Sequence, residues 1–370
     1  MKKWLYLCLV LPLFLVNCDG CSERTLPTVP SFDQLDKKAV RDSWLGGGSP
    51  GNVGVVIHTP GYEQGSNEYK NQMEATRQLQ QAGCIGWVRF DASYGGNENS
   101  NWYYKKAREL GLSIFTIITL EDLETHGWND TIDYFARNYP SSMAFEIAGE
   151  ITNTDPSINP TGTMDPKTYM TKLKAMYAYA MQNHPELRGR ITSAPTFGSG
   201  TGGAKELQTF FENGLFDLDG IIVAINVYTD IALVNYANVL NNPKFAQKLA
   251  RHEVWVTECG QIGTTQQIAF MESVFSRLRS MLHARNIFWY SMYDANDANA
   301  YGLIYGISDE NFTPRPLFAA LIDSTQGTSA AQTPNTPLIV NPPGIDPAIR
   351  HPHSDGADEN GIDRSRRKER

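Results

Sequence analysis

Two glutamates in this sequence each close a short apolar stretch. VWVTE ends at Glu258, and FEIAGE ends at Glu150. Two carboxylates held about 5 Å apart are suited to cleaving a glycosidic bond by double displacement. One attacks the sugar and forms a covalent intermediate, while the other protonates the leaving oxygen and then deprotonates water. The acid needs a raised pKa, to which the negative charge of its partner contributes.

Short apolar segments alternate with amphipathic helical patterns along most of the chain. The segments 166–183 and 264–284 place apolar side chains at helical spacing, and Gly83 and Gly111 stand where helices are expected to stop. Strands that are apolar on both faces indicate parallel pairing beneath helices. Eight strand candidates cover residues 53–58, 85–90, 112–119, 143–149, 190–194, 220–227, 253–258 and 286–291.

Eight strand–helix units predict an α/β fold, the (β/α)8 TIM barrel. A doubly wound sheet is the alternative, but no G-x-G-x-x-G motif follows a strand candidate. In such barrels the active site lies at the C-terminal ends of the strands, and strands four and seven face each other across the mouth. We therefore expect Glu150 and Glu258 to meet there. Glu146 shares the strand parity of Glu150, so it should point into the barrel and need a partner such as Arg89.

Several segments resemble motifs of the clan A retaining glycoside hydrolases. VWVTECG is similar to the seventh-strand motif, and FEIAGEITN to the fourth-strand motif of the family 39 enzymes and their relatives. The resemblance implies that Glu258 is the nucleophile and Glu150 the acid/base. MEATRQLQQAGCIGWVRFDASY and TPRPLFAAL are similar to the second-strand region and the last helix. The resemblance extends over residues 53 to about 322.

The same resemblance implies substrate-binding residues. Arg89 falls at the position of an arginine close to the nucleophile. INVY places Asn226 and Tyr228 where the clan often has His-x-Tyr, whose tyrosine donates a hydrogen bond to the nucleophile. FWYSMYD places Trp289 at the strand-eight aromatic residue that forms the floor of the sugar site.

The fourth-strand motif departs from the clan at two positions. The clan's asparagine before the acid/base is Gly149 here, and the tryptophan before that is Ala148. The asparagine binds the sugar 2-hydroxyl, so Asn153 or a neighbouring loop is a candidate replacement, and a substrate without a free 2-hydroxyl is another explanation. Three functions stay open: a hydrolase of β-glycosidic bonds in a poly- or oligosaccharide, a transglycosylase using the same pair, and a catalytically silent carbohydrate-binding barrel.

Other polar and aromatic residues close predicted strands or lie in loops. His58 ends the first strand, where a substrate contact and a hydrogen-bonded core histidine fit equally well. Asp91 and Asp294 close strands two and eight, as sugar ligands or as helix caps. Ordinary packing is the simpler expectation for three aromatic residues at loops or helix starts, Trp102, Tyr103 and Trp128.

The composition bounds the class of protein. With 370 residues, 41% of them hydrophobic, the chain supports at least one large packed domain. The net charge of -8 provides no basic field, so no nucleic-acid partner is expected. Histidines and cysteines do not cluster at metal-ligand spacing, so we expect neither a metal nor another cofactor. The composition does not indicate an oligomeric state.

Both ends of the chain differ from its middle. Residues 1–20 combine lysines with a short apolar run, which predicts a signal peptide and a secreted, periplasmic or cell-surface protein. The residues before Cys18 resemble a lipoprotein cleavage site, which would attach the protein to a membrane through lipidated Cys18; ordinary secretion is the alternative. Residues 21–50 are predicted to be a polar, Gly-rich lead-in, 51–323 the barrel domain, and 324–370 a disordered tail rich in Pro, Gly, Ser and charge.

Overall fold

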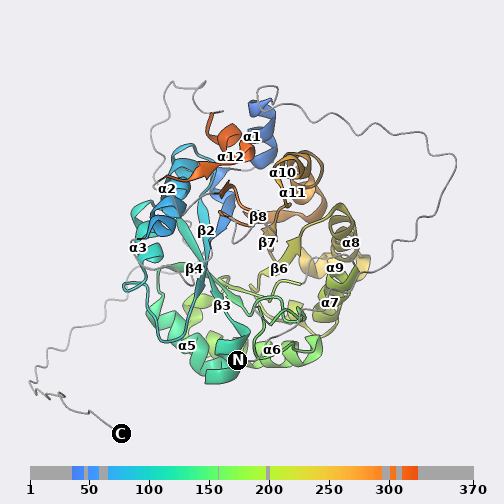
Figure 1. Cartoon of the computed structure of the whole chain (residues 1–370). Coiled ribbons are helices and arrows are strands. Elements are labelled where there is room, and N and C mark those ends of the chain that lie inside the picture. The colour runs from blue at the N-terminus through green and yellow to red at the C-terminus, as the bar shows by residue number, and fades with distance from the viewer. Residues whose placement is uncertain are drawn as a thin grey trace, which may run out of the picture. The chain divides into compact units, whose positions relative to one another are not determined.

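A closed ring of parallel strands forms the centre of the domain that the structure describes. The computed structural model describes residues 36–45, 49–57, 66–156, 158–196, 201–293, 301–305 and 311–323. Eight strands follow the order β5-β4-β3-β2-β1-β8-β7-β6, and bridges from Thr192 to Ile222 and from Thr196 to Ile225 close the ring between β5 and β6. Helices surround this ring (Figure 1). The predicted (β/α)8 barrel is therefore confirmed, and the doubly wound alternative is excluded.

Each barrel strand overlaps a segment predicted from the sequence. The strands are short, and their ends differ from the predicted ends by a few residues. They are β1 (Val53–Ile57), β2 (Trp87–Ala92), β3 (Ser113–Ile118), β4 (Ser142–Ile147), β5 (Ile191–Thr192), β6 (Val223–Val227), β7 (Val254–Cys259) and β8 (Ala284–Trp289). A separate antiparallel pair is formed by β9 (Ile304–Tyr305) and β10 (Thr313–Pro314).

The helices largely follow the apolar periodicity of the sequence. The predicted helix 166–183 is α6, and 264–284 is two helices joined through a π-helical turn at Met271–Phe275. Gly83 and Gly111 follow α2 and α3 with φ of 64° and 69°, the left-handed conformation that ends a helix. The helices are α1 (Lys37–Leu45), α2 (Asn67–Gln81), α3 (Trp102–Glu109), α4 (Leu120–His126), α5 (Trp128–Asn138), α6 (Pro166–Asn183), α7 (Thr201–Glu212), α8 (Asp230–Leu240), α9 (Pro243–Leu249), α10 (Thr264–Phe270), α11 (Ser276–Leu282) and α12 (Pro316–Asp323).

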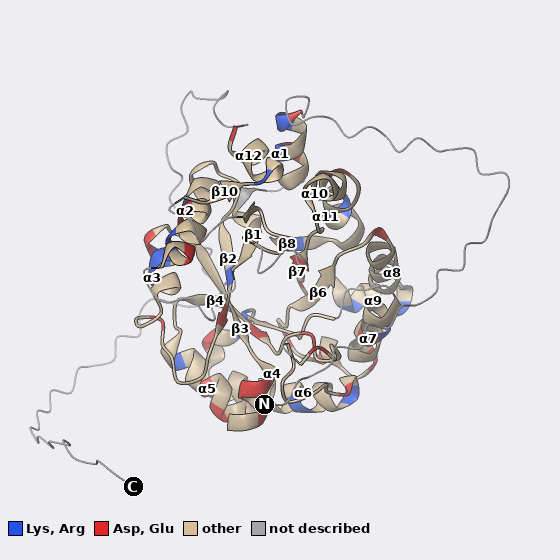
Figure 2. Cartoon of the chain, in the orientation of Figure 1, with Lys and Arg blue, Asp and Glu red and all other residues tan. Residues whose placement is uncertain are grey.

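Alternating side chains of the strands build two cores. The larger core lies between the outer face of the barrel and the helices. The smaller one fills the barrel interior, and its members are Val56, Phe115, Ala144, Ile222, Trp255 and Phe288. This inner plug closes the barrel below the mouth. Figure 2 shows most charged residues on the surrounding helices, with charges also on strands of the ring.

Helix α1 lies in the segment predicted to be a lead-in. Its Trp44 is fully buried, stacks on Phe275 at 5.3 Å between ring centroids, and donates an indole hydrogen bond to the carbonyl of Cys84 at 2.8 Å. The packed domain therefore begins before residue 51. This helix was not predicted from the sequence because only two of its residues, Val40 and Trp44, are buried. Two buried residues are too few for a clear helical pattern.

The signal peptide, Cys18 and the tail fall on residues 1–35 and 324–370, outside the described residues. Their assignments stay predictions. Within the part of the chain that the structure describes, no helix is both long and apolar enough to cross a membrane.

Candidate active site

Glu258 lies on β7 at the mouth of the barrel. The pairing of β6 with β7 shifts after Ile225, so that Asn226 pairs with Glu258 and Thr257 is an extra residue. Strict alternation would send either Thr257 or Glu258 outward, but a bulge re-aims side chains. Both therefore reach Asn226: Thr257 at 2.9 Å and Glu258 at 3.3 Å.

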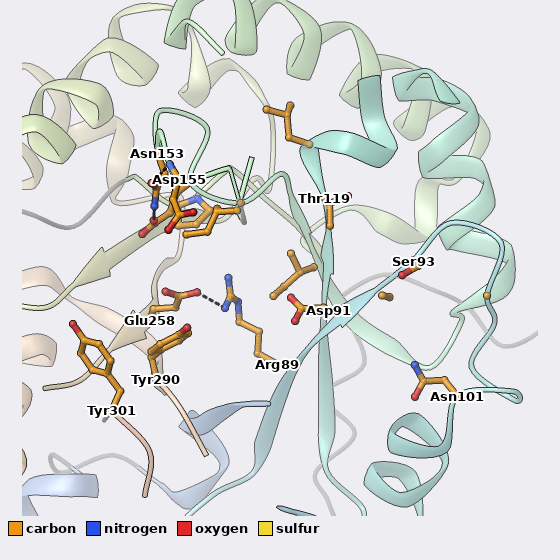
Figure 3. Close-up of a pocket in the computed structure, with 18 of the residues that line it drawn as sticks. Arg89, Asp91, Ser93, Asn101, Thr119, Asn153, Asp155, Glu258, Tyr290 and Tyr301 are labelled. Carbon is orange, nitrogen blue, oxygen red and sulfur yellow. Dashed lines mark hydrogen bonds and ion pairs between the residues drawn. The ribbon is translucent and has the colours of Figure 1, made fainter. Parts of the chain in front are cut away.

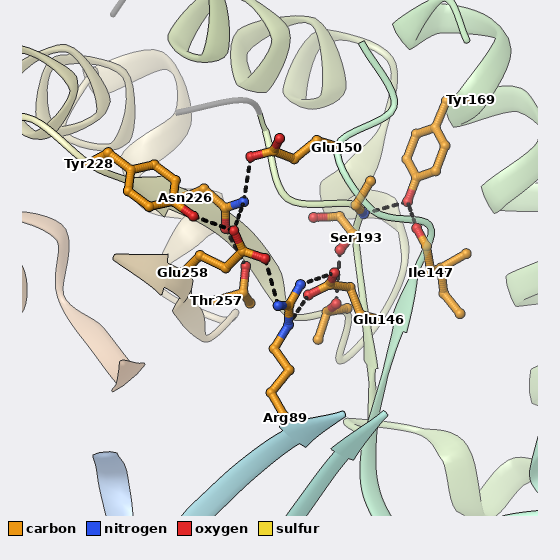
Figure 4. Close-up of polar contacts among 12 residues, drawn as sticks. Arg89, Glu146, Ile147, Glu150, Tyr169, Ser193, Asn226, Tyr228, Thr257 and Glu258 are labelled. Atoms are coloured by element: carbon orange, nitrogen blue, oxygen red, sulfur yellow. Dashed lines mark hydrogen bonds and ion pairs between the residues drawn. The ribbon is translucent and has the colours of Figure 1, made fainter. Parts of the chain in front are cut away.

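Arg89 on β2 joins two carboxylates. Its Nη1 lies 2.7 Å from Oε1 of Glu258, while Nη2 and Nε bind the two oxygens of Glu146 at 2.6 and 3.1 Å (Figure 4). Burial alone would lower the pKa of Arg89, but the charges of Glu146 and Glu258 outweigh this effect and raise it. Glu146 is fully buried. Its predicted inward orientation is confirmed, and Arg89 is its partner.

Glu150 follows β4 rather than belonging to it. The strand ends at Ile147, and Ala148 has a φ of 69°, so the chain turns before Glu150. Its carboxylate is largely buried and accepts hydrogen bonds from Asn226 and Asn153, each at 2.7 Å. Burial, and after it the charge of Glu258, raises the pKa of Glu150 to about 7. This carboxyl group is therefore set to hold a proton near neutral pH.

Asn226 links the two predicted catalytic glutamates. Its Nδ2 donates to Glu150 at 2.7 Å and to Glu258 at 3.3 Å. The hydroxyl of Thr257 donates to Oδ1 of Asn226, which turns the amide nitrogen toward the carboxylates. The two bonded carboxylate oxygens are thus at most about 6 Å apart, compatible with the ~5–5.5 Å separation of a retaining pair and below the ~6.5–9.5 Å of an inverting pair.

Tyr228 is the second donor that reaches Glu258 from β6. Its hydroxyl donates to Oε2, the oxygen that also faces Asn226. Burial, with the charge of Glu258, raises the pKa of Tyr228 well above its ordinary value. The phenol therefore keeps its proton and remains a donor. Arg89, Asn226 and Tyr228, all predicted site residues, thus contact Glu258 directly.

The loop after Glu150 folds back onto it. Asn159 is buried, and its amide nitrogen donates to the carbonyls of Glu150 and Asn153 at 2.7 Å each. Asn153 lines the cavity, but its amide nitrogen is directed at Glu150. Gly149 also lines the cavity, and a Cβ added there would meet no atom within 4 Å. The space beside the acid/base candidate is therefore open.

A cavity of about 1130 Å³ contains both glutamates. Figure 3 shows Glu258, Tyr290 and Tyr301 on one side, Arg89 and Asp91 in the middle, and Ser93 and Asn101 on the far side. Among the described residues, no three His, Cys, Asp or Glu side chains gather as a metal site requires. Cys84 and Cys259 are buried free thiols.

The prediction that Trp289 forms the floor of the sugar site is wrong. Trp289 is fully buried on the outer face of β8, between Trp44 and Phe275 at centroid distances of 5.7 and 6.1 Å. Its neighbour Phe288 points into the barrel, so alternation turns Trp289 outward and brings Tyr290 to the cavity. Three aromatic residues in succession hid this parity in the sequence.

Of the remaining residues considered for the site, some line the cavity and others pack in the core. Asp91 and Trp102 line the cavity. Tyr103 is fully buried, and Trp128 packs against Tyr169 at 5.8 Å, as expected for ordinary packing. His58 and Asp294 lie outside the described residues. Thr257, Tyr290 and Tyr301 also belong to the site, but their roles were not predicted. The only signal for Thr257 in the sequence is its place directly before Glu258.

A search of solved structures found similar barrels. A β-glycosidase matches 79% of this chain and 100% of its own length, with 13% identity and a TM-score of 0.50. The likeness is one of fold. An endo-1,4-β-D-mannanase from Thermotoga petrophila covers 74% of this chain and 99% of its own, at 14% identity and a TM-score of 0.47. A family 1 β-glucosidase from Thermotoga maritima covers 76% and 98%, at 11% identity and a TM-score of 0.48. No protein-family model and no curated protein matches the sequence.

Proposed function

We propose that the protein is a retaining glycoside hydrolase that cleaves β-glycosidic bonds of a poly- or oligosaccharide. One observation carries the proposal: Asn226 binds an oxygen of Glu150 at 2.7 Å and one of Glu258 at 3.3 Å. The two bonded oxygens therefore lie within about 6 Å of each other, which is compatible with the ~5–5.5 Å separation of the carboxylates in double displacement and supports the proposal. The β-glycosidase whose barrel this chain resembles adds support from the fold alone.

The surroundings of the two glutamates assign their roles. Glu258 accepts hydrogen bonds from Arg89, Tyr228 and Asn226, and such donors stabilise a carboxylate and fix its direction. We therefore assign Glu258 as the nucleophile. None of the described lysines and arginines forms an ion pair with Glu150, and burial raises its pKa to about 7, so we assign it as the acid/base.

The proposed reaction has two steps. In the first, a carboxylate oxygen of Glu258 forms a bond to the anomeric carbon as the glycosidic bond breaks, and Glu150 gives its proton to the leaving oxygen. In the second, Glu150 takes a proton from water, whose oxygen attacks the same carbon, and Glu258 leaves as a carboxylate. Both proton transfers return Glu150 to its starting state. Arg89 keeps the nucleophile in place throughout by its ion pair.

A product screen tests the proposal. Purified wild type, Glu258→Gln and Glu272→Gln are incubated with β-linked glucans, xylans, mannans, galactans and bacterial exopolysaccharides, and released oligosaccharides are identified by mass spectrometry. Glu272 is exposed on the π-helical turn and serves as the matched control. We expect wild type and Glu272→Gln to release the same products and Glu258→Gln to release none. Wild-type activity in Glu258→Gln would refute the assigned nucleophile.

Two other outcomes separate the alternative functions. Products longer than the substrate would identify a transglycosylase that uses the same pair. Retention of a glycan with no product from wild type would identify a carbohydrate-binding barrel, which the missing side chain at Gly149 makes reasonable to test. Because a Cβ at Gly149 meets open space, Gly149→Asn then asks whether an amide restores turnover.

We also propose that the protein is exported, because a polysaccharide substrate would lie outside the cell. It rests on the sequence of residues 1–20 alone. Mass analysis of the mature N-terminus would distinguish lipidation at Cys18 from cleavage without a lipid.

A further inference from the structure

The cavity extends well beyond the two glutamates, toward the loop between β2 and α3. Its volume of about 1130 Å³ exceeds the ~300–1,000 Å³ typical of pockets for drug-sized ligands. In Figure 3, Ser93 and Asn101 lie across the cavity from Glu258 and Tyr301. We call this far wall the β2–α3 arm and define it as Tyr69, Ser93, Asn97, Ser100, Asn101 and Trp102, all of which line the cavity.

Two asparagines of the arm have fixed amide groups. The Oδ1 of Asn97 accepts from the backbone N–H of Asn99 and Ser100 at 3.0 and 2.9 Å, as an Asx turn. The Oδ1 of Asn101 caps α3 by accepting from Tyr103 at 3.0 Å. No described residue accepts a hydrogen bond from either Nδ2. Each side chain therefore has its oxygen occupied and its two N–H donors available to a ligand.

An aromatic surface adjoins these donors. Trp102 and Tyr69 are half-buried, and their ring centroids lie 5.0 Å apart. Sugars present apolar C–H groups on their ring faces and hydroxyl groups at their edges. Half-buried aromatic rings beside amide donors match both features.

Hydrogen bonds anchor the loop that carries four residues of the arm, Ser93, Asn97, Ser100 and Asn101. Glu98 is buried and accepts from the backbone and hydroxyl of Ser141 at 2.8 and 3.0 Å and from Arg108 at 3.0 Å. The hydroxyl of Tyr139 donates to the carbonyl of Ser93 at 3.3 Å, and a Cβ at Gly96 would lie 2.7 Å from that hydroxyl oxygen. Such a wall is formed before ligand arrives, so binding does not bear the cost of ordering it.

We propose that the β2–α3 arm is a subsite for a sugar unit remote from the cleaved bond. This inference rests on the proposed function, and it narrows the substrate to a chain of several sugars rather than a single glycoside. Asn97 and Asn101 donate to hydroxyl groups of the remote unit. Tyr69 and Trp102 contact its C–H groups.

The test measures binding without turnover. In the Glu258→Gln background, calorimetry compares cello-, manno-, xylo- and laminari-hexaose with their disaccharides. Asn97→Asp and Asn101→Asp keep the oxygen that holds the turn or cap and remove the donors, and Trp102→Ala removes the ring. The matched controls are Asn242→Asp, which caps α9 outside the cavity, and Trp128→Ala, which begins α5.

We expect at least one hexaose to bind at least tenfold more tightly than its disaccharide. Each arm variant should lose at least fivefold of the hexaose affinity and keep the disaccharide affinity, while both controls bind like the parent. Equal affinities for hexaoses and disaccharides, or arm variants that bind hexaose like the parent, would overturn the inference. Incubation of wild type with the same hexaoses tests cleavage separately. Binding at the arm without cleavage would refute the proposed hydrolase activity but would leave the proposed subsite standing.

Discussion

Glu150 and Glu258 are the same side chain in opposite surroundings. Glu258 is bound by a guanidinium and a phenol, and Glu150 by two asparagine amides. The cation Arg89 therefore pairs with Glu258, whereas the buried Glu150 has the negative charge of Glu258 as its neighbour. This asymmetry, rather than either residue alone, is what a two-step displacement requires.

The pH dependence of turnover follows from Glu150. Its pKa is raised to about 7, so its proton is present below that pH and is lost as the pH rises through it. Because the first step needs this proton, kcat/KM on the substrate found in the screen should fall above a pH of about 7, tenfold per pH unit at the alkaline extreme. The measurement is kcat/KM from pH 4 to 10.

Glu150→Gln provides the control for that assignment. On a 2,4-dinitrophenyl glycoside, whose leaving group needs no proton, the variant should still complete the first step. On the natural glycan its residual kcat/KM should lack the alkaline limb that wild type shows, because an amide does not titrate there. On the natural glycan it should lose roughly 100- to 10,000-fold in rate, the usual contribution of a general acid. An unchanged alkaline limb in Glu150→Gln would assign the titration to another group.

At the scale of elements, Arg89 connects three strands of the barrel. It stands on β2 and pairs with Glu146 of β4 and Glu258 of β7. Removing a buried ion-pair partner leaves uncompensated charge and typically costs about 3–5 kcal/mol. Arg89→Met should therefore lower the free energy of unfolding in urea by about that amount.

Arg77 supplies the comparison on the surface. It pairs with Glu74 on α2, where both side chains are 40% exposed. An exposed pair contributes about 0–1 kcal/mol, so Arg77→Met should change stability little. If both substitutions had equal effects, the buried cluster would have no special role in holding β2, β4 and β7 together.

The strands show what the sequence was able to predict and what it was not. Apolar runs and their alternation with helices were enough for all eight barrel strands and for Glu150 and Glu258 at the mouth. The bulge that brings Thr257 and Glu258 to one face is a register shift between two strands, which no single segment encodes. The prediction for Trp289 was wrong for a related reason. The face of β8 on which Trp289 lies depends on the packing of Phe288 inside the barrel.

On the scale of the whole molecule, the barrel holds the two glutamates in place, and the loops shape the cavity that binds the ligand. The inner plug of apolar side chains lies beneath the mouth, so the glutamates are set on strands and strand ends that packing holds still. The β2–α3 loop and the loop after Glu150 shape the cavity through Asx turns and buried amides. These contacts join residues from different elements, so sequence periodicity did not predict them.

The most direct test of the central claim is to trap the covalent intermediate on the intact protein. Wild type is incubated with a 2,4-dinitrophenyl 2-deoxy-2-fluoro-β-glycoside of the sugar that it releases in the screen. The fluorine slows both steps, and the activated leaving group preserves the first. We predict a mass increase of one fluoroglycosyl group, located by peptide mapping on Glu258 and absent from Glu258→Gln. A label on another residue, or no label on an enzyme that hydrolyses that sugar, would contradict the account.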